Sequence, residues 1–398
     1  MIINGEEYNI NRSTAKVTEW DEIYCKVLKE IIDMGELCEN RTGVDTLSIP
    51  NVSFSIDCEK YFPTLETKKV FLKSTLSELL WIYQAQSNKV SWLHERKNHV
   101  WDGWMIDDDG IYRTYEPYGN EEPDRKVNVV DLYGNIIEGY KAKSRIEGKT
   151  IKSAKFFGLE YAGTIGTCYG GQLSLTKEFD KNVLDKLKNN PQDRRKVVNL
   201  LQQQYLKTAV LPTCVWSSTY KVYRNQLFLD VSVRSNDMPL GNPFNVTQYA
   251  ILQNLVAKVS GLKIGCLDWH ISDCHIYVNQ LEGIKEQLER YNILKKWEKF
   301  ISENSDDKIE NIYLDLLRQQ QIINEKIKQE RYKTSYEAIK RETDINVLAL
   351  EHLITRKDPI LELADKDNFY DFDNSEHNKD IKVKHYTSLP AIKMPIAQ

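Results

Sequence analysis

The stretch that decides the fold is LPTCVWSSTYKVYRNQLFLDVSVRSNDMPLGNPFNVTQYAILQ, residues 211–253. Within it QLFLDVSV (226–233) alternates apolar and polar residues, as expected of a half-buried strand. WSSTYKV precedes this run across the short polar break YRN, and two such runs around a tight turn predict a β-hairpin. With its turn near Arg224, the hairpin would pair Cys214 with Arg234 at a Cβ separation of ~5 Å.

The predicted pairing gives Cys214 a chemical partner. A guanidinium beside a sulfur favours the thiolate, which is the nucleophilic form of cysteine. Cys214 could then act as a nucleophile without a neighbouring histidine. The competing interpretation is that Cys214 is a small buried apolar residue, as cysteines in a core commonly are. The hairpin by itself leaves both interpretations open.

The composition is that of a globular protein with a large core, since 41% of the 398 residues are hydrophobic. Lysine and arginine total 54 against 58 acidic residues, so the formal net charge of -4 attracts neither nucleic acid nor an anionic membrane. The beginning, MIINGEEYNINRST, lacks a signal-peptide pattern, and no apolar run reaches the roughly 18 residues of a membrane span. Seven cysteines without a C-x-x-C pair indicate free thiols, and we expect a cytoplasmic protein.

Segments before the hairpin place further charged residues at the ends of predicted elements. Residues 15–36 have helical periodicity and lead through a loop that holds Arg41 into the strand-like run LSIPNVSFSI. Residues 72–83 also have helical periodicity, with a glutamate inside the apolar run. The helix LDKLKNN is stopped by proline, and Arg194 and Arg195 follow at the start of a strand.

Two stretches look inserted into a single domain that spans residues 1–398. Residues 111–163 are rich in Gly, Tyr, Lys and Asp and contain two YGN triplets, which indicates an irregular or small β insertion. Residues 292–356 are dominated by Glu, Lys, Gln and Ile at helical spacing, which predicts an insertion of one or two long charged helices.

The segment 211–253 resembles the active-site segment of thymidylate synthases. Further motifs of that family stand in order along the chain: NRTGVDTLS, FPTLETKK, SELLWIY, HVWDGW, CYGGQ, NNPQDRR, SDCHIY and AIKMPIAQ. So many motifs in order are far more specific than any one of them. The resemblance implies one catalytic domain with an α+β fold of three layers, in which a large mixed β-sheet is backed by helices. It also implies a homodimer with shared active sites.

The resemblance further implies a covalent mechanism on dUMP. Cys214 would add to C6 of the pyrimidine, and 5,10-methylenetetrahydrofolate would supply a one-carbon unit to C5. Arginines and a serine would hold the 5'-phosphate, which suits a phosphate monoester because guanidiniums form bidentate charge-assisted bonds. These residues are Arg41, Arg234 and Ser235, together with Arg194 and Arg195 from the neighbouring subunit.

Other matching positions would recognise the nucleoside and move protons. The amide of Asn245 offers a donor and an acceptor to the N3 and O4 edge of uracil, whereas an aspartate there would suit cytosine. His275 and Tyr277, on one face of a strand, would bind the ribose 3'-hydroxyl. Glu78 and Tyr169 would organise removal of the C5 proton, a task that favours a carboxyl group with a raised pKa.

The folate would contact Trp101, Asp237 and Lys68. The acid would bind the pterin and the indole would stack near the reacting methylene, although Trp101 could also be a core aromatic.

One rival cluster would bind a metal instead. Cys266, His270 and Cys274 share parity along a predicted strand, but structural zinc sites bring their ligands in close pairs from two separate turns. We therefore expect no metal.

The chain departs from the family pattern at its end and after the paired arginines. Synthases finish with a small aliphatic residue that closes over the folate, whereas this sequence finishes with Gln398, and a polar end could admit water. The usual Trp-Asn pair is replaced by NLLQQQYLKT, and the overall length resembles that of phage deoxyuridylate hydroxymethylases. Water in place of hydride at the shared intermediate would give 5-hydroxymethyl-dUMP.

The sequence therefore favours, by a narrow margin, a deoxyuridylate hydroxymethylase over a thymidylate synthase that gives dTMP and dihydrofolate. A phage-encoded protein would act in the host cytoplasm. From a different class, residues 292–356 could make the chain a non-catalytic binding protein on this scaffold, but the intact cysteine, arginines and asparagine argue against that alternative.

Overall fold

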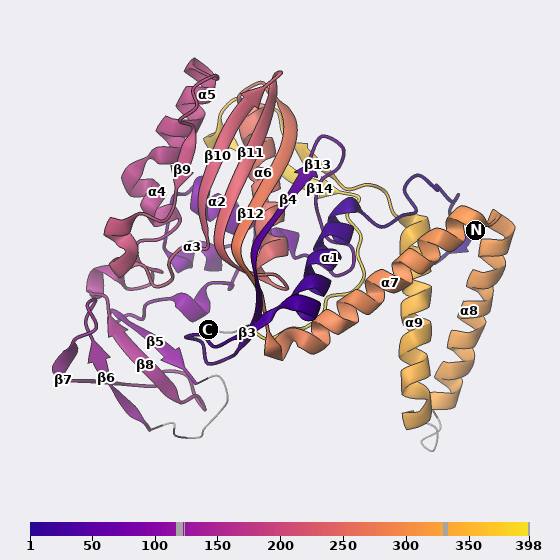
Figure 1. Cartoon of the computed structure of the whole chain (residues 1–398), viewed down its shortest axis with the longest axis horizontal. Coiled ribbons are helices and arrows are strands. Elements are labelled where there is room, and N and C mark those ends of the chain that lie inside the picture. The colour runs from indigo at the N-terminus through magenta and orange to yellow at the C-terminus, as the bar shows by residue number, and fades with distance from the viewer. Residues whose placement is uncertain (117–121, 123, 329–332, 397–398) are drawn as a thin grey trace.

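A six-stranded mixed sheet forms the centre of the protein, in the order β3-β4-β12-β11-β10-β9 (Figure 1). β11 and β12 run parallel, and the other neighbours run antiparallel. The computed structural model describes residues 1–116, 122, 124–328 and 333–396. The strands of this sheet are β3 (Glu36–Cys38), β4 (Thr46–Asp57), β9 (Val197–Asn199), β10 (Val215–Tyr223), β11 (Gln226–Asp237) and β12 (Lys263–Tyr277).

β10 and β11 form the hairpin that the alternating pattern predicts. Arg224 and Asn225 make its two-residue turn with φ of 47° and 62°, the left-handed conformations that a tight hairpin turn requires. A bulge interrupts the ladder near its open end. Beyond the bulge, the Arg234 N–H donates to the Cys214 carbonyl at 2.9 Å. The predicted pairing of Cys214 with Arg234 is therefore confirmed.

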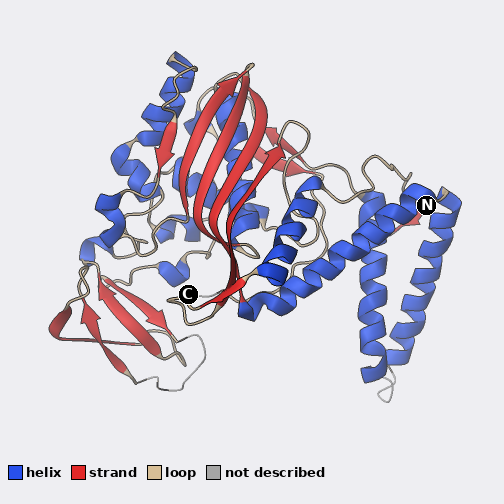
Figure 2. Ribbon diagram, in the orientation of Figure 1, coloured by secondary structure: helices blue, strands red, loops and turns tan. Residues whose placement is uncertain are grey.

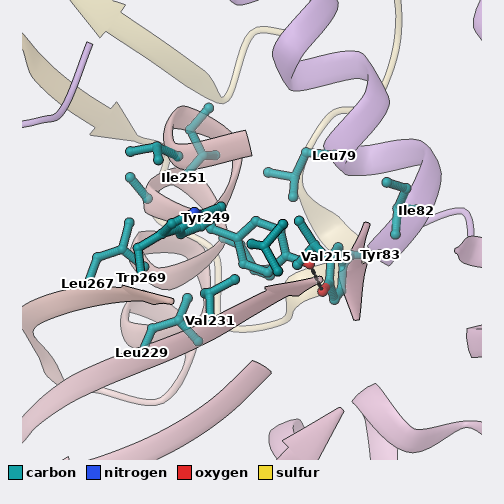
Figure 3. Close-up of a cluster of buried hydrophobic side chains, with 14 of the residues drawn as sticks. Leu79, Ile82, Tyr83, Val215, Leu229, Val231, Tyr249, Ile251, Leu267 and Trp269 are labelled. Atoms are coloured by element: carbon teal, nitrogen blue, oxygen red, sulfur yellow. Dashed lines mark hydrogen bonds between the residues drawn. The ribbon is translucent and has the colours of Figure 1, made fainter. Parts of the chain in front are cut away.

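Three helices enclose the main hydrophobic core: α1 (Glu19–Met34), α2 (Leu72–Tyr83) and α6 (Gly241–Val259). α6 covers β11 and β12, α2 packs against α6, and α1 packs against β4. Figure 3 shows side chains of α2, α6 and the strands meeting in this core, where the hydroxyls of Tyr83 and Tyr249 share a hydrogen bond of 2.9 Å. This packing fixes the position of α2 relative to the sheet.

The sequence of α1 explains where this helix begins and which side it buries. Thr18 caps its first turn, because the threonine hydroxyl oxygen accepts the Asp21 N–H at 3.0 Å. Trp20, Tyr24 and Leu28 recur every four residues and are fully buried, so one face of the helix meets the core.

Shorter elements connect these layers (Figure 2). They are β1 (Ile2–Ile3), β2 (Glu6–Glu7), α3 (Val90–His94), η1 (Asp102–Trp104), η2 (Leu159–Tyr161), α4 (Gly170–Thr176), η3 (Phe179–Leu184), α5 (Asp185–Asn189), η4 (Gln203–Thr208), η5 (Val278–Gln280), β13 (Ile360–Leu363), η7 (Phe369–Asp371) and β14 (Ile381–Lys384). Within the described ranges, no helix combines the length and the apolar character that crossing a bilayer requires.

A separate four-stranded sheet lies beside the loop that holds Arg41. Its order is β5-β8-β6-β7, and it has a small core of its own that includes Ile111 and Ile151. Lys152 donates to the Arg41 carbonyl at 3.1 Å, which joins the two units. The strands are β5 (Ile111–Tyr115), β6 (Lys126–Val130), β7 (Ile136–Lys143) and β8 (Ile151–Phe156). Strands thus occupy much of 111–163, and the status of this stretch as an insertion stays a prediction.

Three long helices stand to one side of the central sheet (Figure 1): α7 (Leu281–Glu303), α8 (Asp306–Ile327) and α9 (Lys333–Thr355). They pack around a second core that includes Leu294, Trp297 and Leu350. Helices therefore fill most of 292–356, but α7 begins before the expected boundary. That this stretch is an insertion likewise stays a prediction.

The end of α9 is tied to the loop that precedes α2. Glu66 in that loop is 2% exposed and accepts from Arg356 Nε at 2.8 Å and Nη2 at 3.0 Å, while His352 Nε2 lies 2.9 Å away. Burial alone would raise the pKa of Glu66, but His352 and Arg356 hold this pKa below its ordinary value. The long helices thus supply buried cationic and imidazole partners to a loop of the central domain.

Candidate active site

Cys214 lies directly before β10 and is half-buried. Its Sγ atom is 3.9 Å from Arg234 Nη2, and its backbone N–H donates to the Tyr169 hydroxyl at 3.2 Å. The guanidinium of Arg234 is itself fixed, because it donates to the carbonyls of Thr213 at 3.1 Å and Pro212 at 2.6 Å. Cys214 therefore contacts a fixed cation through its thiol and a phenol through its backbone N–H.

The ionisation of Cys214 depends on its burial as well as on the neighbouring charges. Burial raises the pKa of the Cys214 thiol above its ordinary value, and the charges of Arg234 and Arg41 only partly oppose that effect. The guanidinium is present as predicted and acts to lower the thiol pKa, but its effect is smaller than that of burial. The physical reason is that desolvation of the sulfur outweighs the nearby positive charge.

Tyr169 reaches Cys214 from a strained backbone position. It precedes α4 with φ of 45° and ψ of -116°, which is unusual for a residue with a side chain. Gly170 follows it so close to Ser87 that an added Cβ would stand 2.3 Å from the Ser87 carbonyl oxygen. The ring of Tyr169 also meets the ring of Trp101 edge-on, with centroids 5.4 Å apart.

Glu78 is a buried carboxyl group in the middle of α2. It accepts from Trp101 Nε1 at 2.7 Å and from Gln248 Nε2 at 2.8 Å. Burial raises the pKa of Glu78 to about 7, although both hydrogen bonds act to lower it. A raised pKa is what proton transfer near neutral pH requires.

Gln248 is a site residue that the sequence analysis missed. Asn245 Nδ2 donates to Gln248 Oε1 at 3.3 Å, and Asn236 Nδ2 lies 3.5 Å from Asn245 Oδ1. Because Gln248 also donates to Glu78, the amide of Asn245 and the carboxyl group share one hydrogen-bond network. The available signal was helical spacing, since positions 245 and 248 lie on one face of α6.

The parallel pairing of β11 and β12 gathers a second group of polar residues. Ser235 is opposite Asp273, and Asp237 is opposite His275. The Ser235 hydroxyl donates to Asp273 at 3.2 Å, and His275 Nδ1 lies 3.3 Å from the same carboxylate. His275 is the main cause that lowers the pKa of Asp273 to about 2. The ring of Tyr277 stands edge-on to His275 at 5.3 Å.

Two of the three residues expected at the folate site, Asp237 and Lys68, lie near each other, whereas Trp101 contacts Glu78 and Tyr169. Burial raises the pKa of Asp237, and Gln280 Nε2 lies 3.3 Å from its carboxylate. The same Gln280 amide donates to the Pro395 carbonyl at 3.2 Å, which brings the end of the described chain to this site. Lys68 is buried and donates to the Pro239 carbonyl, and burial lowers the pKa of its ammonium group to about 8. Gln398 lies outside the described residues.

The other three arginines predicted to bind the phosphate are exposed. Arg41 lies on the loop between β3 and β4, and its charge acts on Cys214 and Tyr277. Arg194 and Arg195 lie on the turn between α5 and β9, where Arg195 pairs with Asp193 at 2.7 Å. In the described part of one chain, neither of the paired arginines contacts Cys214.

A cysteine beside a guanidinium and near a buried carboxyl group is an arrangement that group-transfer enzymes with a cysteine nucleophile use. The family model described as thymidylate synthase matches residues 22–318. A thymidylate synthase of Clostridium beijerinckii is 35% identical over 282 residues, covering 70% of this chain and 86% of that protein. The thymidylate synthase of Bacillus phage phi3T is 32% identical over 292 residues, covering 69% and 85%.

A solved structure agrees with this relationship. Thermostable thymidylate synthase A from Bacillus subtilis matches with a TM-score of 0.58 and 25% identity, covering 95% of this chain and 99% of that one. The chain therefore belongs to the thymidylate synthase family, whose members are one-carbon transferases.

Proposed function

We propose that the protein transfers a one-carbon unit from a reduced folate to C5 of dUMP through a covalent bond between Cys214 Sγ and C6. The observation that carries this proposal is the pair of contacts made by Cys214. Its Sγ lies 3.9 Å from Arg234 Nη2, and its backbone N–H donates to the Tyr169 hydroxyl. Membership of the thymidylate synthase family supports the reaction class.

Substrate binding uses cations that the fold already holds. Arg234 spends only part of its five N–H donors on the carbonyls of Pro212 and Thr213, which leaves others for the 5'-phosphate. Arg41 and Ser235 complete the site from this chain. The exposure of Arg194 and Arg195 supports their insertion into the site of a second copy, so that the working protein is a homodimer with shared active sites.

The covalent step forms the Sγ–C6 bond while the thiol proton leaves to solvent, and the displaced ring electrons move toward C5 and O4. Asn245 can donate to O4 and stabilise the developing negative charge there. His275 and Tyr277 would bind the ribose 3'-hydroxyl.

Proton removal from C5 falls to the network of Glu78. The carboxylate takes this proton through water that Tyr169 and Asn245 help to hold. Because its pKa is about 7, Glu78 can accept and release a proton near neutral pH.

The folate supplies the one-carbon unit when it is bound. Two of the three residues expected to contact it have side chains that suit folate binding. Asp237 has an acceptor carboxyl group suited to a pterin amide, and Gln280 holds it in place. Trp101 has its indole N–H engaged by Glu78, which fixes the face of its ring. Lys68 is buried and donates to the Pro239 carbonyl, and its positive charge acts to lower the pKa of Asp237. We assign Lys68 this electrostatic role.

The final step distinguishes two products. The missing Trp-Asn pair after the paired arginines favours water and hence 5-hydroxymethyl-dUMP, which we retain as the narrower proposal. The similar proteins of Clostridium beijerinckii and phage phi3T are thymidylate synthases, which favours the alternative, hydride transfer that gives dTMP.

The test is to incubate the protein with dUMP and 5,10-methylenetetrahydrofolate and to identify the nucleotide product by mass. A hydroxymethyl product with tetrahydrofolate supports the narrower proposal, and dTMP with dihydrofolate refutes it while supporting the shared transfer step. Recovery of unchanged dUMP would refute the transfer itself and favour a non-catalytic binding protein.

A further inference from the structure

Two histidines and an aspartate that have no role in the proposed function come together on the surface of the protein. His94 Nε2 is 2.7 Å from one carboxylate oxygen of Asp102, and His99 Nδ1 is 3.0 Å from the other. The two imidazole rings are stacked, with centroids 4.9 Å apart. All three ligand atoms lie within 4.8 Å of one another. No other group of three metal-binding side chains is as close in the part of the chain that the structure describes.

The backbone between the two histidines is held in a defined turn. Lys97 has φ of 56°, and the N–H groups of Lys97 and Asn98 donate to the carbonyls of His94 and Leu93 at 2.9 and 3.0 Å. This pair of bonds is the pattern of a helix end closed by a left-handed residue. The turn directs the chain back so that the second imidazole stacks on the first.

Buried contacts anchor the same turn to the body of the protein. Asn98 is 2% exposed, and its side-chain amide donates to the Ser74 carbonyl at 3.0 Å and the Ser77 hydroxyl at 2.9 Å. Arg96 stacks on Trp92 and donates to the Asn374 carbonyl at 2.6 Å. The three ligand side chains are therefore displayed from a fixed loop while their own atoms stay accessible to solvent.

We propose that His94, His99 and Asp102 form a binding site for one divalent transition cation of the zinc, cobalt or nickel class. Imidazole nitrogens with a carboxylate are the donor set that such cations prefer, whereas magnesium and calcium prefer oxygen donors alone. Three protein ligands leave at least one coordination position for water. This inference goes beyond the proposed function and does not rest on it, although Asp102 directly follows Trp101.

The experiment is a titration of the full-length protein with Co²⁺ at pH 7.5, followed by visible absorption and calorimetry. Cobalt is chosen because the chain has seven cysteines, and thiolate ligation would add an intense near-ultraviolet band that nitrogen and oxygen ligands do not give. We expect one cobalt ion per chain without that band.

Variants assign the ligands. His99→Gln and Asp102→Asn change exposed side chains, and each should weaken Co²⁺ binding by at least about tenfold. His270→Gln is the matched control, because His270 is also an exposed histidine beside a carboxylate, with Asp230 at 3.1 Å, and it should bind as the wild type does. Unchanged affinity in His99→Gln and Asp102→Asn, a thiolate band, or an equal loss in His270→Gln would each overturn the proposal.

Discussion

At the scale of single residues, burial changes the ionisation of two groups in the proposed site, Cys214 and Glu78. Burial raises the pKa of the Cys214 thiol even though Arg234 stands beside it, and burial also raises the pKa of Glu78 to about 7. A protonated thiol is less prone to oxidation than a thiolate. The raised pKa therefore limits oxidation of Cys214, and Glu78 can exchange protons near neutral pH.

Replacing Cys214 tests the covalent step. Cys214→Ser should lower turnover by orders of magnitude, because serine at this position lacks a thiol that can ionise near neutral pH. Mass spectrometry of the protein with dUMP and the folate should show a nucleotide adduct for the wild type and none for the variant. Cys266→Ser, a change at a half-buried cysteine on β12, should retain both adduct and turnover. Full activity in Cys214→Ser would contradict the mechanism.

The pH dependence of the reaction tests Glu78. If its ionised form accepts the C5 proton, kcat/KM should rise with pH and level off above about 7. Glu78→Gln should lower kcat by ~10²–10⁴-fold and remove that inflection, whereas Glu147→Gln, in the exposed turn between β7 and β8, should change neither. An inflection that persists in Glu78→Gln would assign it to another group.

At the scale of elements, the contact between α9 and the loop before α2 is a buried junction between the two cores. Glu66 and Arg356 have side chains 3% and 1% exposed, so the pair is shielded from water. Such a pair contributes little net stability compared with apolar residues, but it is costly to break from one side. The junction thus makes the long helices and the central domain dependent on each other.

Removing one partner should expose that dependence. Arg356→Ala should destabilise the fold by about 3–5 kcal/mol, because Glu66 is left buried without its guanidinium. Urea unfolding measures the change, and Arg318→Ala, in an exposed pair on α8, should cost far less. Since the pKa of Glu66 is lowered in the folded state, the wild-type advantage should be present above pH 4.5 and disappear as the pH falls through the folded pKa. Equal stability of Arg356→Ala and the wild type would contradict this account.

Local features of the sequence predicted these elements better than distant contacts did. The register that pairs Cys214 with Arg234 follows from strand alternation and a two-residue turn, both of which act within one hairpin. The contact of Gln248 with Glu78 spans 170 positions, and that of Arg356 with Glu66 spans 290. No local pattern encodes such separations. The raised pKa of the Cys214 thiol was not apparent for a related reason, because the sequence shows the neighbouring charge but not the burial of the sulfur.

At the scale of the whole molecule, one chain gathers most of the proposed site around Cys214, but its paired arginines do not contact that cysteine in the described residues. Arg194 and Arg195 lie on an exposed turn before the edge strand β9. Half-exposed residues such as Phe228 and Asp230 alternate with the buried positions of β11, so a sheet face remains for a second copy. A symmetric pair would place each turn at its partner's site.

Mixing inactive variants tests this assembly. Arg194→Ala with Arg195→Ala should lower kcat/KM by about 100-fold or more, because two charge-assisted contacts to phosphate are lost. If sites are shared, re-equilibrating that protein with Cys214→Ser should restore up to about a quarter of wild-type activity, through mixed dimers that have one intact site. Arg12→Ala should be active without mixing. A monomer in solution, or no recovery after subunit exchange, would contradict shared sites.

Because Trp101 donates a hydrogen bond to Glu78, the fluorescence of this tryptophan should report the protonation of the proposed general base. An indole whose N–H points at a carboxyl group feels a different electric field when that group loses its proton. The emission maximum of Trp101 should therefore shift as the pH crosses about 7, and subtracting the spectrum of Trp101→Phe removes the signal of the other tryptophans. The protein would thus carry its own optical indicator of when Glu78 is charged, readable without substrate.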